Sequence, residues 1–331
     1  MKIDASRPSH WLLLVLQLAW TLAAIVGRTV SRRGDRNATV LYGHQFCGNL
    51  KALYHAWAES PRTGEMYYLS LDPEHARALE AQGINVLRCH RLRDMLVLMR
   101  THTMVTDHGL HLMSPLLRCT DIRFVDVWHG IPFKGFVPGD FKLQHRYDET
   151  WVSSPLLKSL YEDRFGFRPE QVLSLGYART DQLFRRDIDP AQARRDLGLP
   201  PDAPVVLFAP TWEQDNKGRN IFPFDSGEAQ FLGRLGAACS AHGATLVVRA
   251  HQNSRPGDSE IGGVAYCSQR DYPDSEAVLL AADMLICDWS SIAFDFLALE
   301  RPTLFLDVPA PFSNGFSLGP EYRFGRIVDS L

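Results

Sequence analysis

The chain has 331 residues, a hydrophobic content of 45% and a formal net charge of -3. The composition is ordinary for a globular protein with a sizeable core, and the length favours two domains. The charge balance argues against nucleic-acid binding, which usually leaves a basic signature. Its six cysteines are scattered without a CxxC pair, which favours buried free thiols over a disulfide framework or a zinc site.

The first 36 residues contain an apolar run from Trp11 to Val26, interrupted only by Gln17 and Thr21. The run is long for a signal-peptide core and slightly short for a membrane span of about 20 residues. On a helix its polar residues fall on one narrow line, which leaves a very wide apolar face. A basic cluster lies behind the run, made up of Arg28, Arg32, Arg33 and Arg36.

Three interpretations of this segment stay open. It is a membrane anchor that spans or lies on the bilayer, a cleaved signal peptide, or a helix of the protein core. The basic residues behind the run argue against export and favour the cytoplasmic side for the remainder of the chain. We expect residues 1–36 to associate with the cytoplasmic face of the cell membrane.

Short apolar runs alternate with helical patterns from Ala38 onward. We expect strands at 38–42, 66–71, 85–87, 104–106, 124–128, 151–153 and 172–176, and helices at 50–59, 73–83 and 155–165. Such alternation is typical of βαβ units and a parallel sheet. The sequence therefore predicts an α/β domain over residues 37–190.

Residues 185–204 are charged and proline-rich, which indicates a linker or hinge. The alternation then restarts, with strands expected at 205–209, 245–249, 284–287 and 303–306 and helices at 231–242, 276–282 and 292–299. This predicts a second α/β domain over residues 191–331. A fold of this kind normally needs a closing helix after its last strand, so we expect the chain to be a fragment or a short member of its class.

Several polar residues come directly after expected strands. They are His129 in the first domain and Thr211, Arg249, His251, Ser290 and Ser291 in the second. In open α/β sheets, ligands bind beyond the carboxyl ends of the strands, and two such domains place these ends across a central cleft.

The stretch from Met284 to Pro302 reads as a buried strand, a polar turn and a helix. Hydroxyl and backbone N–H groups at a helix N-terminus bind phosphate well. Ser290 or Ser291 is alternatively a plain N-cap, and a lone histidine such as His129 is often structural. The shared position of these residues after strands favours a phosphate site.

Six motifs together resemble the CDP-glycerol glycerophosphotransferase family, whose enzymes build teichoic acids and related polymers. The matching stretches are Val127–Pro132, Val152–Ser154, Gly176–Asp181, Ala209–Trp212, Val248–His251 and Ala282–Pro302. The loop Gly48–Tyr54 also resembles the acceptor-side domain of that family. The resemblance implies a GT-B-like fold of two Rossmann-type domains with parallel sheets.

The resemblance also implies roles for individual residues. His129 would be the general base and His251 a second catalytic residue. His251 and Arg249 would meet the donor pyrophosphate. Ser290 and Ser291 would bind the same phosphates. The remaining assignments are Asp288 as the residue that positions the turn, Thr211 and Trp212 as donor-proximal, and Asn49 and Lys134 as acceptor-side. The family usually has proline where Gln252 stands and often tyrosine at Trp289, which affects the shape of the pocket.

The implied reaction moves a glycerol phosphate or ribitol phosphate unit from a CDP-polyol to a hydroxyl of a lipid-linked or polymer acceptor, with release of CMP. We expect no cofactor, no tightly bound metal and no nucleic-acid partner. Two alternatives remain: a GT-B glycosyltransferase that uses a nucleotide sugar, and a non-catalytic, membrane-docked binder of anionic polymer. A donor screen distinguishes a nucleotide-sugar glycosyltransferase from the implied transferase. Replacement of His129 tests whether the chain is only a binder.

Overall fold

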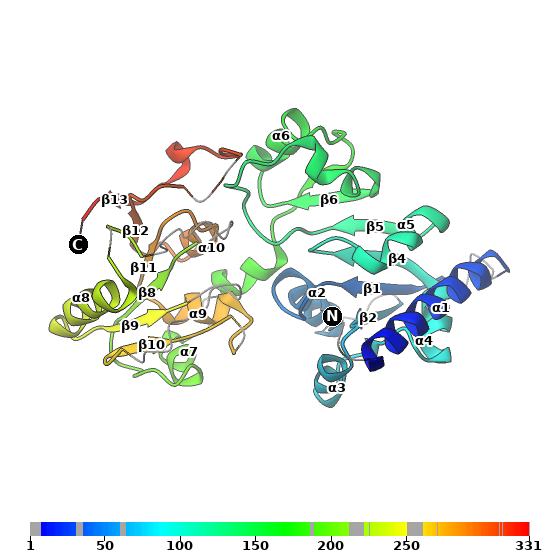
Figure 1. Cartoon of the computed structure of the whole chain (residues 1–331), viewed down its shortest axis with the longest axis horizontal. Helices are drawn as coiled ribbons and strands as arrows, with labels where there is room; N and C mark the ends of the chain where they lie inside the picture. Colours follow the sequence, from blue (N-terminus) through cyan, green and yellow to red (C-terminus); the bar gives the residue numbers. More distant parts are fainter. Residues whose placement is uncertain are drawn as a thin grey trace. The chain divides into compact units, whose positions relative to one another are not determined.

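The structure, a computed structural model, describes residues 8–30, 36–59, 64–185, 189–211, 222–224, 226–249, 261–269, 271–310, 312 and 314–330. The chain divides into two compact units. The N-terminal unit comprises Met1–His129 and Val137–Arg179, and the C-terminal unit comprises Gly130–Phe136 and Thr180–Leu331. Each unit is built on one parallel sheet (Figure 1).

The sheet of the N-terminal unit has seven strands in the order β3-β2-β1-β4-β5-β6-β7, all parallel. Its strands are β1 (Ala38–Tyr42), β2 (Glu65–Leu69), β3 (Val86–Leu87), β4 (Thr101–Thr106), β5 (Arg123–Asp126), β6 (Glu149–Val152) and β7 (Val172–Ser174). Neighbouring residues such as Val40 and Leu41 are both fully buried, because helices cover both faces of a parallel sheet. This explains why the strands read as continuous apolar runs.

Two helical layers cover this sheet. Residues of α1 (Pro8–Val30), α4 (Leu92–Arg100) and α5 (Ser114–Cys119) pack in one core cluster, and residues of α2 (Gly48–Glu59) and α3 (Pro73–Ala81) pack in the other. A further helix, α6 (Pro155–Asp163), comes after β6 and packs against β6 and β7. The expected α/β class is confirmed in this unit.

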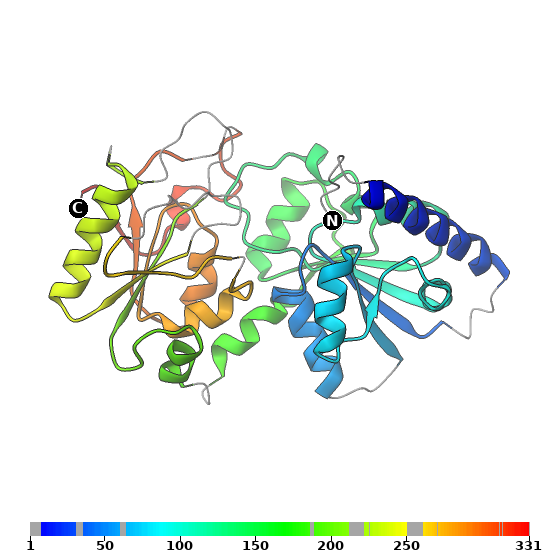
Figure 2. The same cartoon turned by 60° about the horizontal axis from the view of Figure 1, so that its bottom comes forward.

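Helix α1 packs against the N-terminal unit and runs beside α4 (Figure 2). A Cβ atom at Gly27 would lie 2.7 Å from the sulfur of Met99, so glycine permits the close approach of the two helices. Trp11–Thr29 is also long and apolar enough to cross a membrane, judged by length and composition alone.

The sheet of the C-terminal unit has six parallel strands in the order β10-β9-β8-β11-β12-β13. Its strands are β8 (Val205–Ala209), β9 (Thr245–Val248), β10 (Val264–Tyr266), β11 (Met284–Cys287), β12 (Thr303–Leu306) and β13 (Arg326–Val328). One face packs on α8 (Glu228–Ala241) and the other on α7 (Pro190–Asp196), α9 (Ser275–Ala281) and α10 (Ile292–Leu297).

The expectation of a linker throughout residues 185–204 is wrong where α7 forms. Asp189 caps this helix by accepting a hydrogen bond from the N–H of Ala191, and Pro190 occupies its first turn. Arg194 is buried, donates to the carbonyl oxygen of Ala281 and forms an ion pair with Asp283. The charged composition therefore conceals a helix that is part of the core.

A short segment, Gly130–Phe136, leaves the N-terminal unit and packs within the C-terminal unit. The N–H of Gly135 donates to the carbonyl oxygen of Gly315 at 2.7 Å, and the hydroxyl of Ser317 donates to that of Lys134 at 2.6 Å. The ring of Phe133 lies 5.1 Å from that of Phe294 in α10. The segment directly after His129 is thus built into the C-terminal unit.

Candidate functional site

Three neighbouring strands in the middle of the N-terminal sheet, β1, β4 and β5, end in loops that carry histidines. His44 follows β1, Asp107 and His108 follow β4, and His129 follows β5. The rings of His108 and His129 are stacked, with centroids 4.1 Å apart and planes inclined by 10°. His44 lies 5.0 Å from His108 and 5.2 Å from His111. We call His44, His108, His111 and His129 the histidine cluster.

The tautomer of His129 is determined by its hydrogen bond. Its Nδ1 lies 2.8 Å from the backbone carbonyl oxygen of Asp107, which can only accept, so Nδ1 carries the proton and donates it. The lone pair therefore resides on Nε2, the atom a base would use. The residue itself is exposed to solvent at one side.

The neighbours of His129 favour its neutral form. Packing by the surrounding protein and, next, the positive charge of His108 lower the pKa of His129 below its ordinary value. Burial alone would also lower the pKa of His108, but its contact with Asp107 outweighs that effect and raises it. The Nδ1 of His108 lies 2.8 Å from the carboxylate of Asp107. The surroundings thus shift the pKa values of the two stacked rings in opposite directions.

A buried carboxyl group shapes the loop that presents His129. Asp126 is 1% exposed and accepts a hydrogen bond from the N–H of Trp128 at 2.9 Å. Burial raises the pKa of Asp126 to about 7. Trp128 has a φ of 41°, a left-handed conformation that is strained for a bulky residue. The turn before His129 is therefore held in a strained form by a local side-chain bond.

Asn49 fixes the same loop from α2. Its amide nitrogen donates to the carbonyl oxygens of Val127 at 2.9 Å and Trp128 at 2.8 Å, and its amide oxygen accepts from the N–H of Arg179 at 3.1 Å. The side chain is 2% exposed. Through these three bonds, Asn49 joins the backbone directly before His129 to the backbone at Arg179.

In the C-terminal unit, Asp288 joins the ends of two adjacent strands, β8 and β11. One of its carboxylate oxygens accepts from both the N–H and the hydroxyl of Thr211, each at 2.7 Å. Asp288 is 1% exposed, so these bonds replace the water it has lost. Thr211 and Asp288 thereby fix the turn that leads to Ser290 and Ser291.

Ser291 occupies the N-cap position of α10, but its side chain makes no capping hydrogen bond. Ser290 and Ser291 are both partly exposed. A Cβ atom at Gly130 would lie 2.9 Å from the hydroxyl oxygen of Ser291, so only glycine fits beside this hydroxyl without a shift. The geometry does not support the plain capping role that remained open for Ser291.

Arg249 follows β9 and is 6% exposed. Its guanidinium donates to the carbonyl oxygen of Tyr272 at 2.9 Å and to the hydroxyl of Ser275 at 3.1 Å. The side chain therefore holds the segment between β10 and α9 at the carboxyl end of the sheet.

Three further residues complete the predicted set. Lys134 belongs to the C-terminal unit, where its ammonium group lies 5.5 Å from the centre of the Phe136 ring. Trp212 and His251 lie outside the described residues. The structure thus groups Thr211, Asp288, Ser290 and Ser291 in one unit and Asn49 and His129 in the other.

His44, Asp107 and His108 are not among the residues predicted from the sequence. Each comes after an expected strand, which is the same signal that singled out His129. The strand order, which makes β1, β4 and β5 neighbours, is the information that the sequence lacks. Within the described residues, no group of three or more His, Cys, Asp or Glu side chains is arranged to hold a metal ion.

The chain matches known proteins over most of its length. Residues 29–308 match the family described as CDP-Glycerol:Poly(glycerophosphate) glycerophosphotransferase. A teichoic acid poly(glycerol phosphate) polymerase of Bacillus subtilis is 26% identical over 305 residues, which is 83% of this chain and 39% of that protein. The corresponding polymerase of Bacillus spizizenii is 27% identical, over 86% of this chain and 77% of that protein. A ribitol-phosphate polymerase, TarK, of Staphylococcus aureus is 29% identical over 55% of this chain and 38% of its own length.

The fold is also found in a solved structure. The structure of the wall teichoic acid polymerase TagF aligns with 95% of this chain and with 85% of the TagF chain, with a TM-score of 0.68 and 18% sequence identity. At that identity the likeness concerns the fold alone, and it agrees with the GT-B-like, two-sheet architecture expected from the motifs. The resemblance drawn from the six motifs is confirmed by the family match, and the chain belongs to the CDP-glycerol:poly(glycerophosphate) glycerophosphotransferase family.

Proposed function

We propose that the chain transfers a glycerol phosphate or ribitol phosphate unit from a CDP-polyol to a hydroxyl group of a membrane-associated acceptor, with release of CMP. The observation that carries this proposal is the Nδ1–H bond of His129 to Asp107, which leaves Nε2 as a proton acceptor in a family of phosphotransferases. The relatives named above polymerise glycerol phosphate or ribitol phosphate, and the first of them is more than twice as long as the matched region.

The proposed step is an in-line displacement. The acceptor oxygen attacks the β-phosphorus of the donor, the bond from that phosphorus to the bridging oxygen breaks, and CMP leaves with the electron pair. Nε2 of His129 takes the proton of the acceptor hydroxyl. Because charge spreads over phosphate oxygens, positioning and electrostatic stabilisation dominate the catalysis.

The lowered pKa of His129 bears on its strength as a base. A base with a pKa far below neutrality accepts a proton weakly, and catalysis is best when the pKa lies near the working pH. A bound pyrophosphate is anionic, so it would raise the pKa of a nearby imidazole. We propose that His129 becomes an effective base only when the donor is present.

The C-terminal unit supplies the proposed donor site. The hydroxyls of Ser290 and Ser291 would bind the donor phosphates, and Arg249 and His251 would add positive charge. Asp288 acts through Thr211 by fixing the turn, as its buried hydrogen bonds support. Trp212 and Lys134 stay proposed contacts of the donor and the acceptor, respectively.

The test is a donor screen followed by a histidine exchange. We expect CMP release from CDP-glycerol or CDP-ribitol, whereas UDP release from UDP-sugars would support a glycosyltransferase and contradict the proposal. His129→Ala should lower kcat by roughly 10²–10⁴-fold. His102→Ala is the matched control, because His102 lies exposed at the opposite end of β4. If His129→Ala turns over donor like the unaltered chain, the assigned base is wrong.

We also propose that the chain works at the cytoplasmic face of the cell membrane on a lipid-linked or polymer acceptor. A nucleotide-activated donor is made in the cytoplasm, and the apolar helix α1 supports membrane association. The activity of a cell extract should sediment with the membrane fraction, and activity found only in the soluble fraction would count against this location.

A further inference from the structure

The hydrogen bonds between β4 and β5 lead directly to His129. The two strands pair in parallel as far as Thr106 and Asp126. Beyond them, the N–H of Val127 donates to the carbonyl oxygen of Thr106 at 2.8 Å. The Nδ1–H of His129 then donates to the next carbonyl oxygen along β4, that of Asp107, at 2.8 Å. The imidazole of His129 therefore continues the hydrogen bonding of the sheet past the ends of its strands.

Glycines and a buried hydroxyl fix the loop that carries Asp107 and His108. The hydroxyl of Thr106, which is fully buried, donates to the carbonyl oxygen of Gly109 at 3.1 Å. Gly109 has a φ of 81°, a left-handed conformation that glycine adopts without strain. After β1, a Cβ atom at Gly43 would overlap a carboxylate oxygen of Asp107. Asp107 thus fills a place that is shaped by the ends of two strands.

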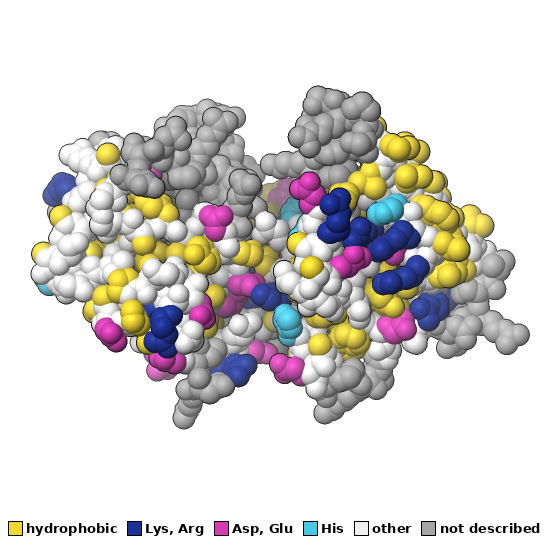
Figure 3. All heavy atoms as spheres, turned by 90° about the horizontal axis from the view of Figure 1, so that it is seen from below, with side chains coloured by type: hydrophobic (Ala, Val, Ile, Leu, Met, Phe, Trp, Pro, Cys, Tyr) yellow, Lys and Arg dark blue, Asp and Glu magenta, His cyan; other side chains and the backbone are white. Residues whose placement is uncertain are grey.

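The carboxylate of Asp107 is buried within the protein. Figure 3 shows basic and acidic side chains on the surface, where water solvates them. Asp107 is only 4% exposed, and a carboxylate removed from water needs opposite charge or hydrogen-bond donors nearby. His108 supplies such a contact, because its Nδ1 lies 2.8 Å from the carboxylate. Burial opposes the charged form of His108, but the contact with Asp107 outweighs burial and raises its pKa.

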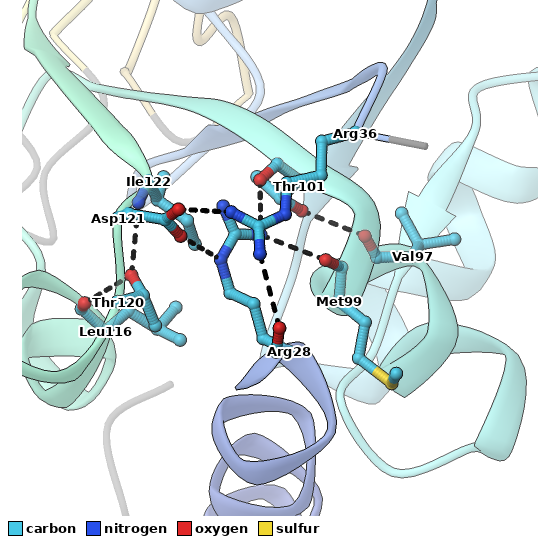
Figure 4. A network of polar contacts seen from close by, with 9 residues as sticks. All are labelled: Arg28, Arg36, Val97, Met99, Thr101, Leu116, Thr120, Asp121 and Ile122. Atoms are coloured by element: carbon cyan, nitrogen blue, oxygen red, sulfur yellow. Dashed lines mark hydrogen bonds and ion pairs between the residues drawn. The ribbon is translucent and has the colours of Figure 1, made fainter. Parts of the chain in front are cut away.

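Helix α1 holds the sheet behind these loops. Its Arg28 donates to the carbonyl oxygen of Thr101, the first residue of β4, at 2.6 Å (Figure 4). The same guanidinium forms an ion pair at 2.8 Å with Asp121, which comes shortly before β5. Beyond the end of β2, the amide nitrogen of Gln17 donates to the carbonyl oxygen of Leu71 at 3.0 Å. The two strands that carry the stacked histidines are therefore joined at their beginnings as well as at their ends.

We propose that Asp107 and His108 are positioning residues for His129. Asp107 contacts both rings: its backbone carbonyl oxygen accepts the Nδ1–H of His129, and its carboxylate holds His108. The two rings are stacked with centroids 4.1 Å apart, so His108 restricts the plane of the His129 ring. Together the two residues fix the tautomer and the orientation that leave Nε2 as the proton acceptor. This inference rests on the proposed function, in which His129 is the base.

His108 has an electrostatic role as well. A positive charge beside His129 opposes the addition of a second one. Burial and, next, the charge of His108 lower the pKa of His129. The charge thus keeps Nε2 free before the reaction. After transfer it promotes the passage of the accepted proton from Nε2 to solvent, which restores the base.

Other titratable or charged groups also face the two rings. Arg179 and His44 oppose protonation of His129. Asp126 favours the charged form of His108. With one further histidine that packs against His44, the groups are Asp126 in β5, His44 after β1, His111 in η2 (His111–Met113) and Arg179 in η5 (Ala178–Phe184). None of them is altered when His108 is exchanged, so a change at His129 reports that exchange.

The first test measures the tautomer of His129 without any donor. The full chain, labelled with ¹⁵N in its histidine rings, is compared with its variants by NMR at pH 8, and His129→Asn identifies the His129 signals. We expect a single tautomer, with the proton on Nδ1, in the unaltered chain and a mixture of tautomers in His108→Ala. Asp107→Asn keeps the backbone carbonyl oxygen but loses the charge that holds His108, so it should lie between the two. Circular dichroism verifies that each variant is folded.

The second test follows CMP release with the donor identified by the screen. His108→Ala should lower kcat roughly 10–100-fold with little change in the KM for the donor, because the base is less well positioned. His108→Phe should recover part of this loss, since it restores a stacked ring. Its kcat/KM should decline on the acid side at a pH about one unit higher than in the unaltered chain, because no charge opposes protonation of His129. His102→Ala is the matched control and should change neither quantity, because His102 lies exposed at the opposite end of β4.

Two results would overturn the inference. One is a single tautomer together with an unchanged kcat in His108→Ala. The other is a His108→Phe chain with the kcat of His108→Ala and the pH profile of the unaltered chain. If either is found while His129→Ala abolishes CMP release, the proposed function stands and only the positioning role is refuted. If the unaltered chain releases no CMP from any donor, the proposed function fails, and the tautomer measurement alone decides whether Asp107 and His108 hold His129.

Discussion

The buried carboxyl group of Asp126 should make the stability of the protein fall as pH rises, and Asp126→Asn should remove that dependence. Burial raises its pKa from 3.8 to about 7. Between these two values the native state holds a proton that the unfolded state has released. Stability therefore declines with pH across this interval, and the full penalty is present above pH 7.

The size of the penalty is set by the change in pKa between the unfolded and the native state. Each pKa unit corresponds to about 1.4 kcal/mol, so a rise from 3.8 to about 7 sets an upper bound of about 4 kcal/mol. Asparagine has nearly the same shape, and its amide oxygen can accept the same bond from the N–H of Trp128 without a charge. The variant should match the unaltered chain near pH 4 and exceed its stability by about 2–4 kcal/mol at pH 8.

The assay is urea denaturation of the full chain at a series of pH values from 4 to 8, monitored by tryptophan fluorescence and circular dichroism. Asp163→Asn serves as the control, because Asp163 is exposed on α6 and its exchange should shift the midpoint little at any pH. If Asp126→Asn lowers stability equally at every pH, the carboxylate is ionised and stabilised in the native state. That result would refute the reasoning about its burial.

Two further exchanges test the supports of the site. Asn49→Ala removes the bonds to Val127, Trp128 and Arg179, so it should cost about 1–3 kcal/mol of stability and lower kcat more than it changes the KM for the donor. Gly130→Ala should destabilise the C-terminal unit, because the new methyl group would lie 2.9 Å from the hydroxyl oxygen of Ser291. The double variant Gly130→Ala/Ser291→Ala should regain stability, because the close contact is removed. It should still bind the donor weakly, because it lacks the hydroxyl that would bind the donor phosphates.

For each of these exchanges, one outcome would contradict the expected effect. An Asn49→Ala chain with unchanged kcat would show that the loop before His129 keeps its form without the amide. A double variant as unstable as Gly130→Ala would show that the contact with Ser291 is not the cause. Chemical denaturation measures the stability of these variants. Steady-state kinetics with the donor identified by the screen measures kcat and KM.

Much of the fold could be predicted because the strands are buried on both faces. Such strands read as uninterrupted apolar runs, and β1, β8, β11 and β12 lie where those runs stand in the sequence. The sequence also indicated that His129 and Ser290 come directly after strands. The family motifs added the order of these elements and the class of chemistry.

The sequence did not reveal α7, because its stability comes from distant partners. Arg194 reads as a solvated linker charge until it meets Asp283 and the carbonyl oxygen of Ala281. The same reason explains the missed residues Asp107 and His108. Their importance depends on β4 lying between β1 and β5, and strand order is set by pairing between segments far apart in the chain.

The amino-acid sequence by itself determined the two α/β units, the family and the loops that carry its chemistry, because these depend on local periodicity and short motifs. Only the tertiary structure decided which way the polar line of α1 faces and which residues surround His129. Gln17 and Arg28 find carbonyl oxygens more than fifty residues away, and those contacts turn the apolar side of the helix outward. Contacts of that kind arise only when the chain has folded.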